Sequence, residues 1–299
     1  TTVTNNAGAT FTIFGNVQLE GDLTNNGSIT STNGTFTHTA STAYFLTNNA
    51  GASITAAGNI ATEGVLTNSG TITSTGGTFT KASGSGNVNN TASTATITAS
   101  GNIQIEGNIT NSGTLISTGG TFTHSNGAYS VTNNAGATIQ SSGNMQMEGD
   151  ITNRGTITVT TGAFTHTSST AYFLTNNSGA SITASGTIST EGPLTNAGTI
   201  TSTAGSFSKI LSSNVNNSTS SASITAVGNM RMEGNITNTG DIITSTGTFT
   251  HSNAAYSVTN NAGALIRCVG NMQMEGDITN TGSIITTTGM FSHTASTAY

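Results

Sequence analysis

The stretch Asn87–Ser130, NVNNTASTATITASGNIQIEGNITNSGTLISTGGTFTHSNGAYS, contains the information for the whole architecture, because the rest of the 299-residue chain consists of edited copies of it. Each copy contains the dipeptide Glu-Gly once, at a spacing of 42 or 43 residues. The seven glutamates are Glu20, Glu63, Glu106, Glu148, Glu191, Glu233 and Glu275. A fixed period of about 20 to 50 residues is typical of repeat proteins, in which each unit buries its apolar face against its neighbours.

Each copy is itself double. The run Leu46–Thr55 resembles Leu66–Thr73, with two additional residues in its first turn, so the structural unit is about half a copy. Within a unit, short apolar islands alternate with Thr or Ser and stop at Asn and Gly, which is typical of short strands between turns. We therefore predict an all-β fold: a right-handed, three-sided parallel β-helix (β-solenoid) of about 14 rungs, in seven double-rung repeats.

We expect a single rod over residues 1–299. The predicted repeats are approximately 2–44, 45–86, 87–129, 130–172, 173–213, 214–256 and 257–299. With strands about 4.8 Å apart, fourteen rungs predict a length of roughly 67 Å. The positions expected to point inward are Leu46, Ile54, Ile60, Leu66, Ile72, Phe79 and their equivalents.

Composition limits the classes of protein to be considered. Charged residues are 5% of the chain, where a usual globular domain has about 25%, and Thr, Ser and Asn take their place. Low complexity alone would suggest disorder, but an isoleucine stays in phase through five successive copies, which a disordered chain does not require. These isoleucines are Ile54, Ile97, Ile139, Ile182 and Ile224.

The net charge of −6, with no basic run, gives no electrostatic basis for binding nucleic acid or an anionic membrane. No apolar run is long enough to insert into a bilayer. Cys268 is the only cysteine, so no disulfide holds the fold, and avoidance of Cys suits a secreted bacterial protein. Because the chain starts with Thr1 at the start of a repeat, we expect it to be a processed or truncated piece.

A second, longer period orders the copies. Copies one, four and seven share an ending, residues 37–44, 165–172 and 292–299, that we call the a ending. Copies two and five have a b ending with a lysine (80–86 and 208–213), and copies three and six a c ending (123–130 and 250–257). This order predicts stepwise duplication and a longer native chain. We expect the chain's partner to be itself, assembled end to end or laterally into a long extracellular filament. We favour open β edges that continue into further repeats of one chain; the alternative is 299-residue subunits stacked end to end, which would break the order of the endings at each joint.

Asparagines recur after the first Thr of most units, at positions that include Asn48, Asn68, Asn111, Asn133, Asn153 and Asn176. Identical amides stacked at rung spacing can hydrogen-bond along the axis, so we predict structural ladders. Glycine follows the second turn of the copy, as at Gly70 and Gly113, where we expect a positive φ that a Cβ would not tolerate.

Two sets of ionisable residues recur. The glutamates lie two rungs apart, about 9.6 Å, which is compatible in general terms with paired-carboxylate catalysis. However, seven equivalent copies offer no unique cleft, so a solvated stripe is expected. The second set is His38, Lys81, His124, His166, Lys209, His251 and His293.

The sequence does not decide whether the glutamates and the His or Lys residues occupy equivalent positions in successive turns. Counted from Gly101 and Gly119, Glu106 and His124 share a phase, and the two sets would alternate along one edge and pair weakly. Counted from the apolar residues Ile103 and Phe122, they differ by one residue. A ladder of metal ions is the sharper alternative in the first case, but the lysines interrupt it, and we expect no metal and no cofactor.

Several single positions carry further expectations. Pro193 should lie in a turn or at the first position of a strand, because a central ladder position would lose a backbone donor. The methionines that replace Ile103 and Ile105 in copies four, six and seven should fill the core. They are Met145, Met147, Met230, Met232, Met272 and Met274. No Ser-His-Asp set, phosphate-binding loop or Cys-rich metal spacing is present, and regular Asp for calcium-binding repeats is lacking.

The runs Ile109–Gly120, Leu66–Gly77 and Ile151–Gly162 resemble the rungs of filamentous-haemagglutinin-type and autotransporter-type adhesins. The likeness covers the whole chain but is specific only to the class. It implies a secreted right-handed β-helix on a bacterial surface, serving as an adhesin shaft or fibre, with host or neighbouring-cell glycans as candidate partners. The chain departs from that class in its strict 43-residue pairing.

Three functions are therefore weighed. The leading one is a structural, non-catalytic extracellular filament or adhesin shaft. The alternative is a binding surface for ice or polysaccharide, formed by rows such as Thr71-Ile72-Thr73 and Thr35-Phe36-Thr37. An enzyme is not expected, because catalysis needs one unique site.

Overall fold

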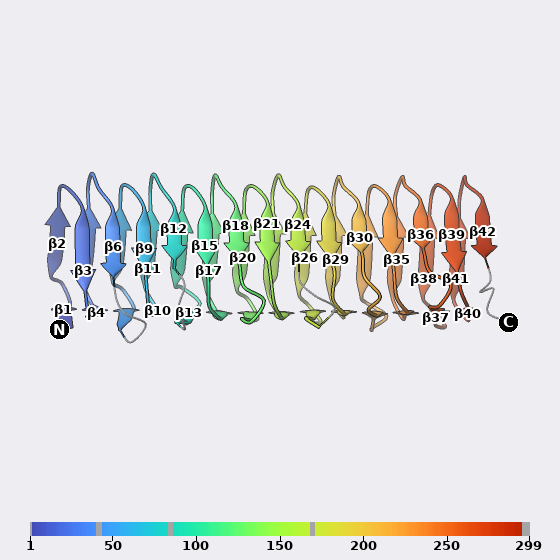
Figure 1. Ribbon diagram of the computed structural model, residues 1–299, viewed down its shortest axis with the longest axis horizontal. Coiled ribbons are helices and arrows are strands. Elements are labelled where there is room, and N and C mark those ends of the chain that lie inside the picture. Colours follow the sequence, from blue (N-terminus) through green and yellow to red (C-terminus); the bar gives the residue numbers. More distant parts are fainter. Residues whose placement is uncertain (1, 40–43, 83–85, 168–170, 295–299) are drawn as a thin grey trace. The chain divides into compact units, whose positions relative to one another are not determined.

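The computed structural model describes residues 2–39, 44–82, 86–167 and 171–294. Over these ranges the chain forms 42 short strands joined by turns, without a helix. Every third strand belongs to the same sheet, which gives three parallel sheets of 14 strands each (Figure 1). The fold is a right-handed, three-sided parallel β-solenoid of 14 turns, as the sequence predicts.

Sheet A holds the first strand of each turn, which places an aliphatic residue and an Asn inward. Its strands are β1 (Thr2–Asn5), β4 (Asp22–Asn25), β7 (Phe45–Asn48), β10 (Val65–Asn68), β13 (Val88–Asn90), β16 (Ile109–Asn111), β19 (Val131–Asn133), β22 (Ile151–Asn153), β25 (Leu174–Asn176), β28 (Leu194–Asn196), β31 (Val215–Asn217), β34 (Ile236–Asn238), β37 (Val258–Asn260) and β40 (Ile278–Asn280).

Sheet B holds the second strand, which in most turns places Ile and then Ala or Ser inward. Its strands are β2 (Thr10–Ile13), β5 (Ser28–Ser31), β8 (Ser53–Ala56), β11 (Thr71–Ser74), β14 (Thr96–Ala99), β17 (Thr114–Ser117), β20 (Thr138–Ser141), β23 (Thr156–Val159), β26 (Ser181–Ala184), β29 (Thr199–Ser202), β32 (Ser223–Ala226), β35 (Asp241–Thr244), β38 (Leu265–Cys268) and β41 (Ser283–Thr286).

Sheet C holds the third strand, which in most turns places Phe, Ile or Met inward and then, in alternate turns, His or Lys. Its strands are β3 (Val17–Glu20), β6 (Phe36–Thr39), β9 (Ile60–Thr62), β12 (Phe79–Lys81), β15 (Ile103–Ile105), β18 (Phe122–His124), β21 (Met145–Met147), β24 (Phe164–His166), β27 (Ile188–Thr190), β30 (Phe207–Lys209), β33 (Met230–Met232), β36 (Phe249–His251), β39 (Met272–Glu275) and β42 (Phe291–Thr294).

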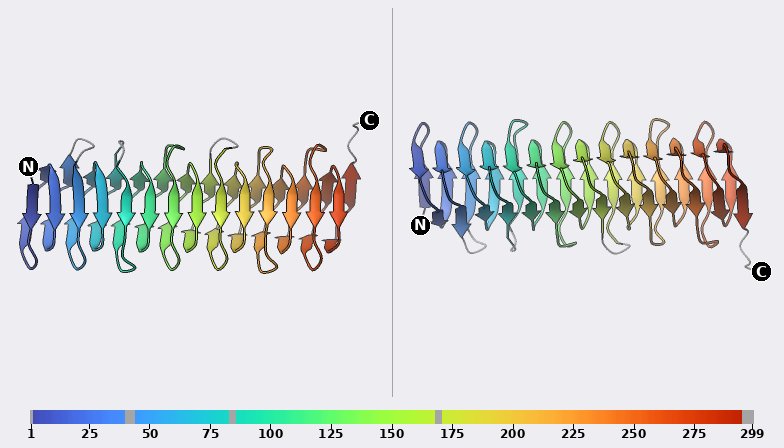
Figure 2. Two further views of the ribbon diagram at one scale, coloured as in Figure 1. Left: turned by 90° about the horizontal axis from the view of Figure 1, so that it is seen from below. Right: turned by 90° about the horizontal axis from the view of Figure 1, so that it is seen from above.

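The chain forms two compact units. The first consists of Thr1–Glu148 and Gly155–Thr160, and the second of Gly149–Arg154 and Thr161–Tyr299. Within each unit, strands of successive turns lie side by side in parallel (Figure 2).

The register within each unit places like residues on like residues. In the first unit Leu46 pairs with Leu66, and Ile54 with Ile72. Ile60 pairs with Phe79 in the same way. All six of these predicted inward side chains are completely buried, so the predicted core is confirmed. Each such side chain contributes about 1.5 to 3 kcal/mol when fully buried, which only a neighbouring turn makes possible. The six methionines predicted as core fillers are buried as well.

Pro193 lies in the connection between β27 and β28, one residue before the ladder begins at Leu194. Its carbonyl accepts a hydrogen bond from the Leu174 nitrogen at 2.9 Å, while its own nitrogen is outside the ladder, as expected. In the other six Glu-Gly turns the glycine has a positive φ, but Gly192 does not. The following proline restricts the backbone of Gly192 and explains this difference.

Candidate functional site

The asparagines at the ends of the sheet A strands form the predicted ladder. In the first unit, Nδ2 of each Asn donates to Oδ1 of the Asn one turn later, at 2.8 or 2.9 Å, from Asn5 through Asn25, Asn48, Asn68, Asn90 and Asn111 to Asn133. The second unit repeats this from Asn153 through Asn176, Asn196, Asn217 and Asn238 to Asn260 and Asn280. Every amide points the same way along the chain.

Ladder amides also donate to a main-chain carbonyl at the corner of the next turn. Nδ2 of Asn48 donates to the carbonyl of Thr71 at 3.1 Å, and Nδ2 of Asn68 to that of Thr96 at 3.0 Å. The side chains are completely buried, so these bonds replace water for carbonyls at the corner between sheets A and B. The ladder therefore joins neighbouring turns and fixes where each corner lies.

The glycines of this corner are needed for a different reason from the predicted one. Gly70 and Gly113 do not have a positive φ, so that expectation is wrong. A Cβ on Gly70 would lie 2.3 Å from the carbonyl oxygen of Ala52, and one on Gly113 2.1 Å from that of Ala95. The turns stack so closely that a backbone carbonyl of the neighbouring turn occupies the space that a Cβ would need. The positive φ belongs instead to glycines of the other turn type at this corner, such as Gly51.

The His and Lys column lies inside the solenoid. The register pairs His38 with Leu19 and Thr62, and Lys81 with Thr62 and Ile105, so these side chains share an inward column with apolar residues. His38, Lys81, His124, His166, Lys209 and His251 are at most 1% exposed; only His293, in the last turn, is exposed. Counting from the apolar residues Ile103 and Phe122 thus gives the correct positions. The alternative prediction, that Glu alternates with His or Lys along one edge, is wrong.

Each histidine in this column binds the carbonyl of the glycine that follows a glutamate, 17 residues earlier. The Nε2 atoms lie 2.6 to 2.9 Å from these oxygens. The pairs are His38 with Gly21, His124 with Gly107, His166 with Gly149, His251 with Gly234 and His293 with Gly276. The Glu-Gly dipeptide is therefore not only a turn: its carbonyl is the inward acceptor for the next turn. The co-occurrence of one Glu-Gly and one His in most copies was the sequence signal for this contact.

The second ring nitrogen differs between endings. In the c endings, Nδ1 of His124 lies 2.9 Å from the carbonyl of Glu148, and Nδ1 of His251 2.9 Å from that of Glu275. In the second a ending, Nδ1 of His166 contacts Oγ1 of Thr190 at 3.2 Å. In the first a ending, Nδ1 of His38 and Oγ1 of Thr62 are buried without a hydrogen bond in the described structure.

Burial lowers the pKa of His124, against the opposing effects of its bonds to Gly107 and Glu148 and of the Glu148 charge. Burial also lowers the pKa of His166, and the Lys209 charge lowers it further, while the bond to Gly149 and the charges of Glu191 and Asp150 raise it. Both rings are therefore neutral at pH 7. A neutral ring has one N–H and donates to one acceptor, so His124 serves one of its two carbonyls at a time.

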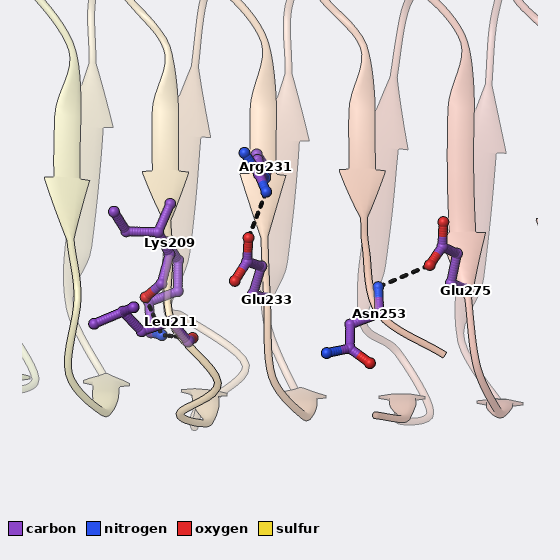
Figure 3. Close-up of polar contacts among 7 residues, drawn as sticks. Lys209, Leu211, Arg231, Glu233, Asn253 and Glu275 are labelled. Atoms are coloured by element: carbon purple, nitrogen blue, oxygen red, sulfur yellow. Dashed lines mark hydrogen bonds and ion pairs between the residues drawn. The ribbon is translucent and has the colours of Figure 1, made fainter. Parts of the chain in front are cut away.

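The lysines of the b endings occupy the same column. Nζ of Lys81 donates to the carbonyl of Ala82 at 3.1 Å. Nζ of Lys209 donates to the carbonyls of Ile210 and Leu211 at 3.0 and 2.9 Å (Figure 3). Burial lowers the pKa of Lys209 to about 8, although the charges of Glu233 and Glu191 raise it. Burial lowers the pKa of Lys81 too, against Glu106 and Glu63. The column as a whole supplies interior N–H donors to backbone carbonyls.

The glutamates lie outside this column, at the corner that leads from sheet C to the next strand of sheet A, which we call the C-to-A corner. Glu20 is exposed and the other six are half-buried. Oε2 of Glu148 accepts from the backbone nitrogen of Asn126 at 2.9 Å, and Oε2 of Glu275 from that of Asn253 at 2.8 Å (Figure 3).

These bonds hold the c loops, in which Asn126 and Asn253 have φ values of 106° and 103°. Glu233 pairs with Arg231 at 2.5 Å (Figure 3). The carboxylates of Glu148, Glu233 and Glu275 thus bind neighbouring backbone or side chains, whereas Glu20 is exposed, as expected for a solvated stripe.

Within the described ranges, no three His, Cys, Asp or Glu residues gather in a way that would hold a metal ion. Nor is any helix of the described chain long and apolar enough to cross a membrane. Cys268 is buried at the inward end of β38, with its thiol against the Gly270 carbonyl at 3.1 Å.

One predicted Thr row, Thr71-Ile72-Thr73, lies on the outer surface of sheet B. The other, Thr35-Phe36-Thr37, belongs to sheet C, where Thr37 lies between Gln18 and Ala61 and forms no column of hydroxyls. The outward columns of sheet B run in register from Thr10 and Thr12 to Thr96 and Thr98. In the next turn Thr114 continues the first column, but Ile116 interrupts the second. The hydroxyl columns are thus regular over five turns.

Comparison with protein-family models, with curated proteins and with solved structures gives no match.

Proposed function

We propose that the chain is part of a non-catalytic structural filament or adhesin shaft, secreted and displayed at the surface of a bacterial cell. The observation that carries this proposal is the Asn ladder. Each unit contains six successive hydrogen bonds between Asn side chains, and every one joins a turn to the next. The buried polar groups thus serve cohesion between turns.

The His and Lys column supports the same role. In an active site, perturbed titratable groups face a cleft in which a ligand can reach them. Here the groups with lowered pKa, such as His124 and Lys209, are buried and donate to main-chain carbonyls. Their arrangement recurs with the repeat, so it suits support of the backbone rather than a reaction.

Extension by repetition fits a spacer. Each turn adds one strand to each of three sheets, about 4.8 Å along the axis, and its apolar residues are buried only against another turn. The surface of Thr, Ser and Asn, with 5% charged residues and one cysteine, favours an extracellular setting. The partners of such a filament are its own further repeats and, for an adhesin, surface glycans.

Immuno-electron microscopy of intact and permeabilised source cells tests this proposal. Antibodies raised against the folded chain should label thin fibres outside intact cells. Labelling only after permeabilisation would contradict the proposal. An unrelated cytoplasmic protein, labelled in parallel, controls for the integrity of the cells.

A second candidate is a surface that binds ice or polysaccharide, favoured by the regular hydroxyl columns on sheet B. Thr71 and Thr73 point outward on β11, next to Ser53 and Thr55 of the turn before. Thermal hysteresis of the purified chain tests the ice alternative. Activity that Thr73→Lys removes, and that Thr80→Lys on sheet C leaves intact, would establish it; the absence of hysteresis would exclude it.

A further inference from the structure

The aromatic residues are divided sharply between the core and one corner. Six phenylalanines are buried in sheet C: Phe36, Phe79, Phe122, Phe164, Phe207 and Phe249. Apart from the first and last turns, the large apolar side chains exposed in the described chain are Phe45, Phe173 and Leu211, all at the C-to-A corner. The four described tyrosines, Tyr44, Tyr129, Tyr172 and Tyr256, lie at this corner too, each half-buried.

The a endings combine the aromatic residues with a carboxylate. Phe45 begins β7, is 45% exposed, and its backbone nitrogen donates to Oδ1 of Asp22 at 3.2 Å. Phe173 immediately precedes β25, is 50% exposed, and its backbone nitrogen donates to Oδ1 of Asp150 at 3.0 Å. Tyr44 and Tyr172 directly precede these phenylalanines. The same arrangement thus recurs 128 residues later, once in each compact unit.

Some polar atoms of this arrangement have no hydrogen-bond partner among the described residues. In the described structure no residue hydrogen-bonds Oδ2 of Asp22 or Asp150, or the hydroxyl of Tyr44 or Tyr172. In the next turn the position beside Phe45 is the half-buried Val65. The aspartate carboxylate therefore lies at the backbone of an exposed phenylalanine, with a half-buried tyrosine one residue before it, in both a endings.

Electrostatics limits the ligand. The C-to-A corner carries all seven glutamates and Asp22, Asp150 and Asp277, leaving only Asp241 elsewhere among the acidic residues. Its two lysines are buried and turned to backbone carbonyls. A polyanion such as nucleic acid or a sulfated glycan is repelled here. A ligand with apolar ring faces and hydroxyl donors matches both the aromatic faces and the carboxylate acceptors.

We propose that Asp22, Tyr44 and Phe45, and again Asp150, Tyr172 and Phe173, form two equivalent binding sites for an uncharged polysaccharide. Sugar rings stack on the phenylalanine and tyrosine faces, and sugar hydroxyls donate to Oδ2 of the aspartate. Identical sites on a repeating protein suit a ligand that is itself a repeating polymer, whereas the surface of a folded protein partner is not repeated. The inference adds a partner to the filament proposed above and does not depend on where the filament is located.

The b endings supply a natural control. Leu211 is 38% exposed at the same corner, but neither a tyrosine nor an aspartate accompanies it. Serine is compatible with the site of Phe45 and Phe173, because Ser130 and Ser257 stand at the equivalent position in the c endings. The double variant Phe45→Ser/Phe173→Ser therefore removes the ring faces without disturbing a core residue.

Isothermal titration calorimetry and saturation-transfer NMR with cellohexaose and N-acetylated chitohexaose, two uncharged oligosaccharides, test the proposal on the whole chain. We expect at least one of them to bind, with affinity reduced at least tenfold in Phe45→Ser/Phe173→Ser and in Asp22→Asn/Asp150→Asn. Leu211→Ser should bind like the unaltered chain. Unchanged urea midpoints verify that each variant is folded.

Three outcomes would overturn the proposal: no binding of either oligosaccharide at millimolar concentration, equal binding by both double variants, or tighter binding of a heparin hexasaccharide. None of these bears on the filament, which the microscopy of intact cells tests separately.

Discussion

Nδ2 of Asn68 donates to Oδ1 of Asn90 at 2.8 Å, across one turn of the solenoid and between two completely buried side chains. Asn90 in turn donates to Asn111 Oδ1 at 2.8 Å and to the carbonyl of Ala95 at 3.2 Å. Replacing Asn90 removes its hydrogen bonds to Asn68, Asn111, the Ala95 carbonyl and the Thr114 carbonyl from a completely buried site. A ladder member is therefore much harder to replace than an exposed Asn.

We expect Asn90→Ala to lower the free energy of unfolding by about 2 to 4 kcal/mol, because it removes four hydrogen bonds inside the solenoid, each of which contributes about 0.5 to 1.5 kcal/mol. Urea unfolding followed by circular dichroism measures the change. The matched control is Asn89→Ala, one residue earlier on the same strand but facing outward, which should change stability by less than about 0.5 kcal/mol. Equal effects of the two substitutions would contradict a stabilising ladder.

Substitutions at two glycines test whether Gly70 is needed because backbone approaches it closely, and not because of a positive φ. Gly70→Ala should destabilise the chain by more than about 3 kcal/mol, because its Cβ would collide with the Ala52 carbonyl at 2.3 Å and the backbone has to move. Gly51→Ala has open space around its Cβ and a φ of +78°, so it should cost only about 1 to 2 kcal/mol. Urea midpoints rank the two; the reverse order would refute close approach as the reason for Gly70.

Acid should weaken the interior column. Because the pKa of His124 and of His166 is lowered in the folded chain, the unfolded chain binds more protons as the pH falls below about 6.5, and folding stability falls with it. Urea midpoints at about pH 7.5 and about pH 5.5, on either side of the ordinary histidine pKa, should therefore differ, with the lower midpoint in acid.

The double variant His124→Met/His166→Met, which uses the residue found at Met147 in the same column, should reduce this difference. A difference between the two pH values that is unchanged in the variant would assign the acid sensitivity to other groups. The variant is expected to be less stable at both pH values, because the Gly107 and Gly149 carbonyls lose their donors.

Alkaline pH should increase the stability that depends on Lys209, whereas acid decreases the stability that depends on the histidines. Its pKa of about 8 lies below the ordinary lysine value of 10.5, so between these two values the folded chain has lost a proton that the unfolded chain retains. Stability contributed by this group therefore rises between about pH 8 and about pH 10.5. The comparison of urea midpoints at about pH 7.5 and about pH 9.5 should show a smaller rise in Lys209→Met than in the unaltered chain. An identical rise in both would show that Lys209 is not the group responsible.

The sequence was sufficient for the core and for the ladder. Leu46, Ile54 and Phe79 recur in phase, and one turn of a parallel solenoid must place like residues on like residues, so their inward direction follows. Asn48 follows from the same reasoning. Pro193 could be placed because it has no backbone donor to contribute to a ladder.

The side chains near the C-to-A corner could not be placed in this way. Gly119 and Gly120 are adjacent, and only Gly120 matches Gly101: Gly101 donates to Gly77 and Gly143 to Gly120 in the same column. Counting from Gly119 shifts His124 by one residue, which in a strand is the difference between outside and inside.

The partners of the column were also beyond the sequence. The carbonyl of Gly107 lies 2.9 Å from Nε2 of His124, in a turn where that glycine has a φ of +105°, and the order of side chains does not state where a backbone carbonyl points. In the same way, the need for Gly70 arises from the Ala52 carbonyl of another turn, so no local turn rule would find it.

The Asn ladder means that the length of this protein can change only in fixed steps. Successive ladder residues are 20 to 23 positions apart, so the spacing tolerates small changes in the loops but always returns an Asn to the same corner. An insertion or deletion of one whole turn leaves every remaining amide with a neighbour of the same kind. Unequal recombination between repeats in the gene can thus lengthen or shorten the protein in steps of whole double-turn copies, which also keep each interior His beside the glycine carbonyl of the preceding turn.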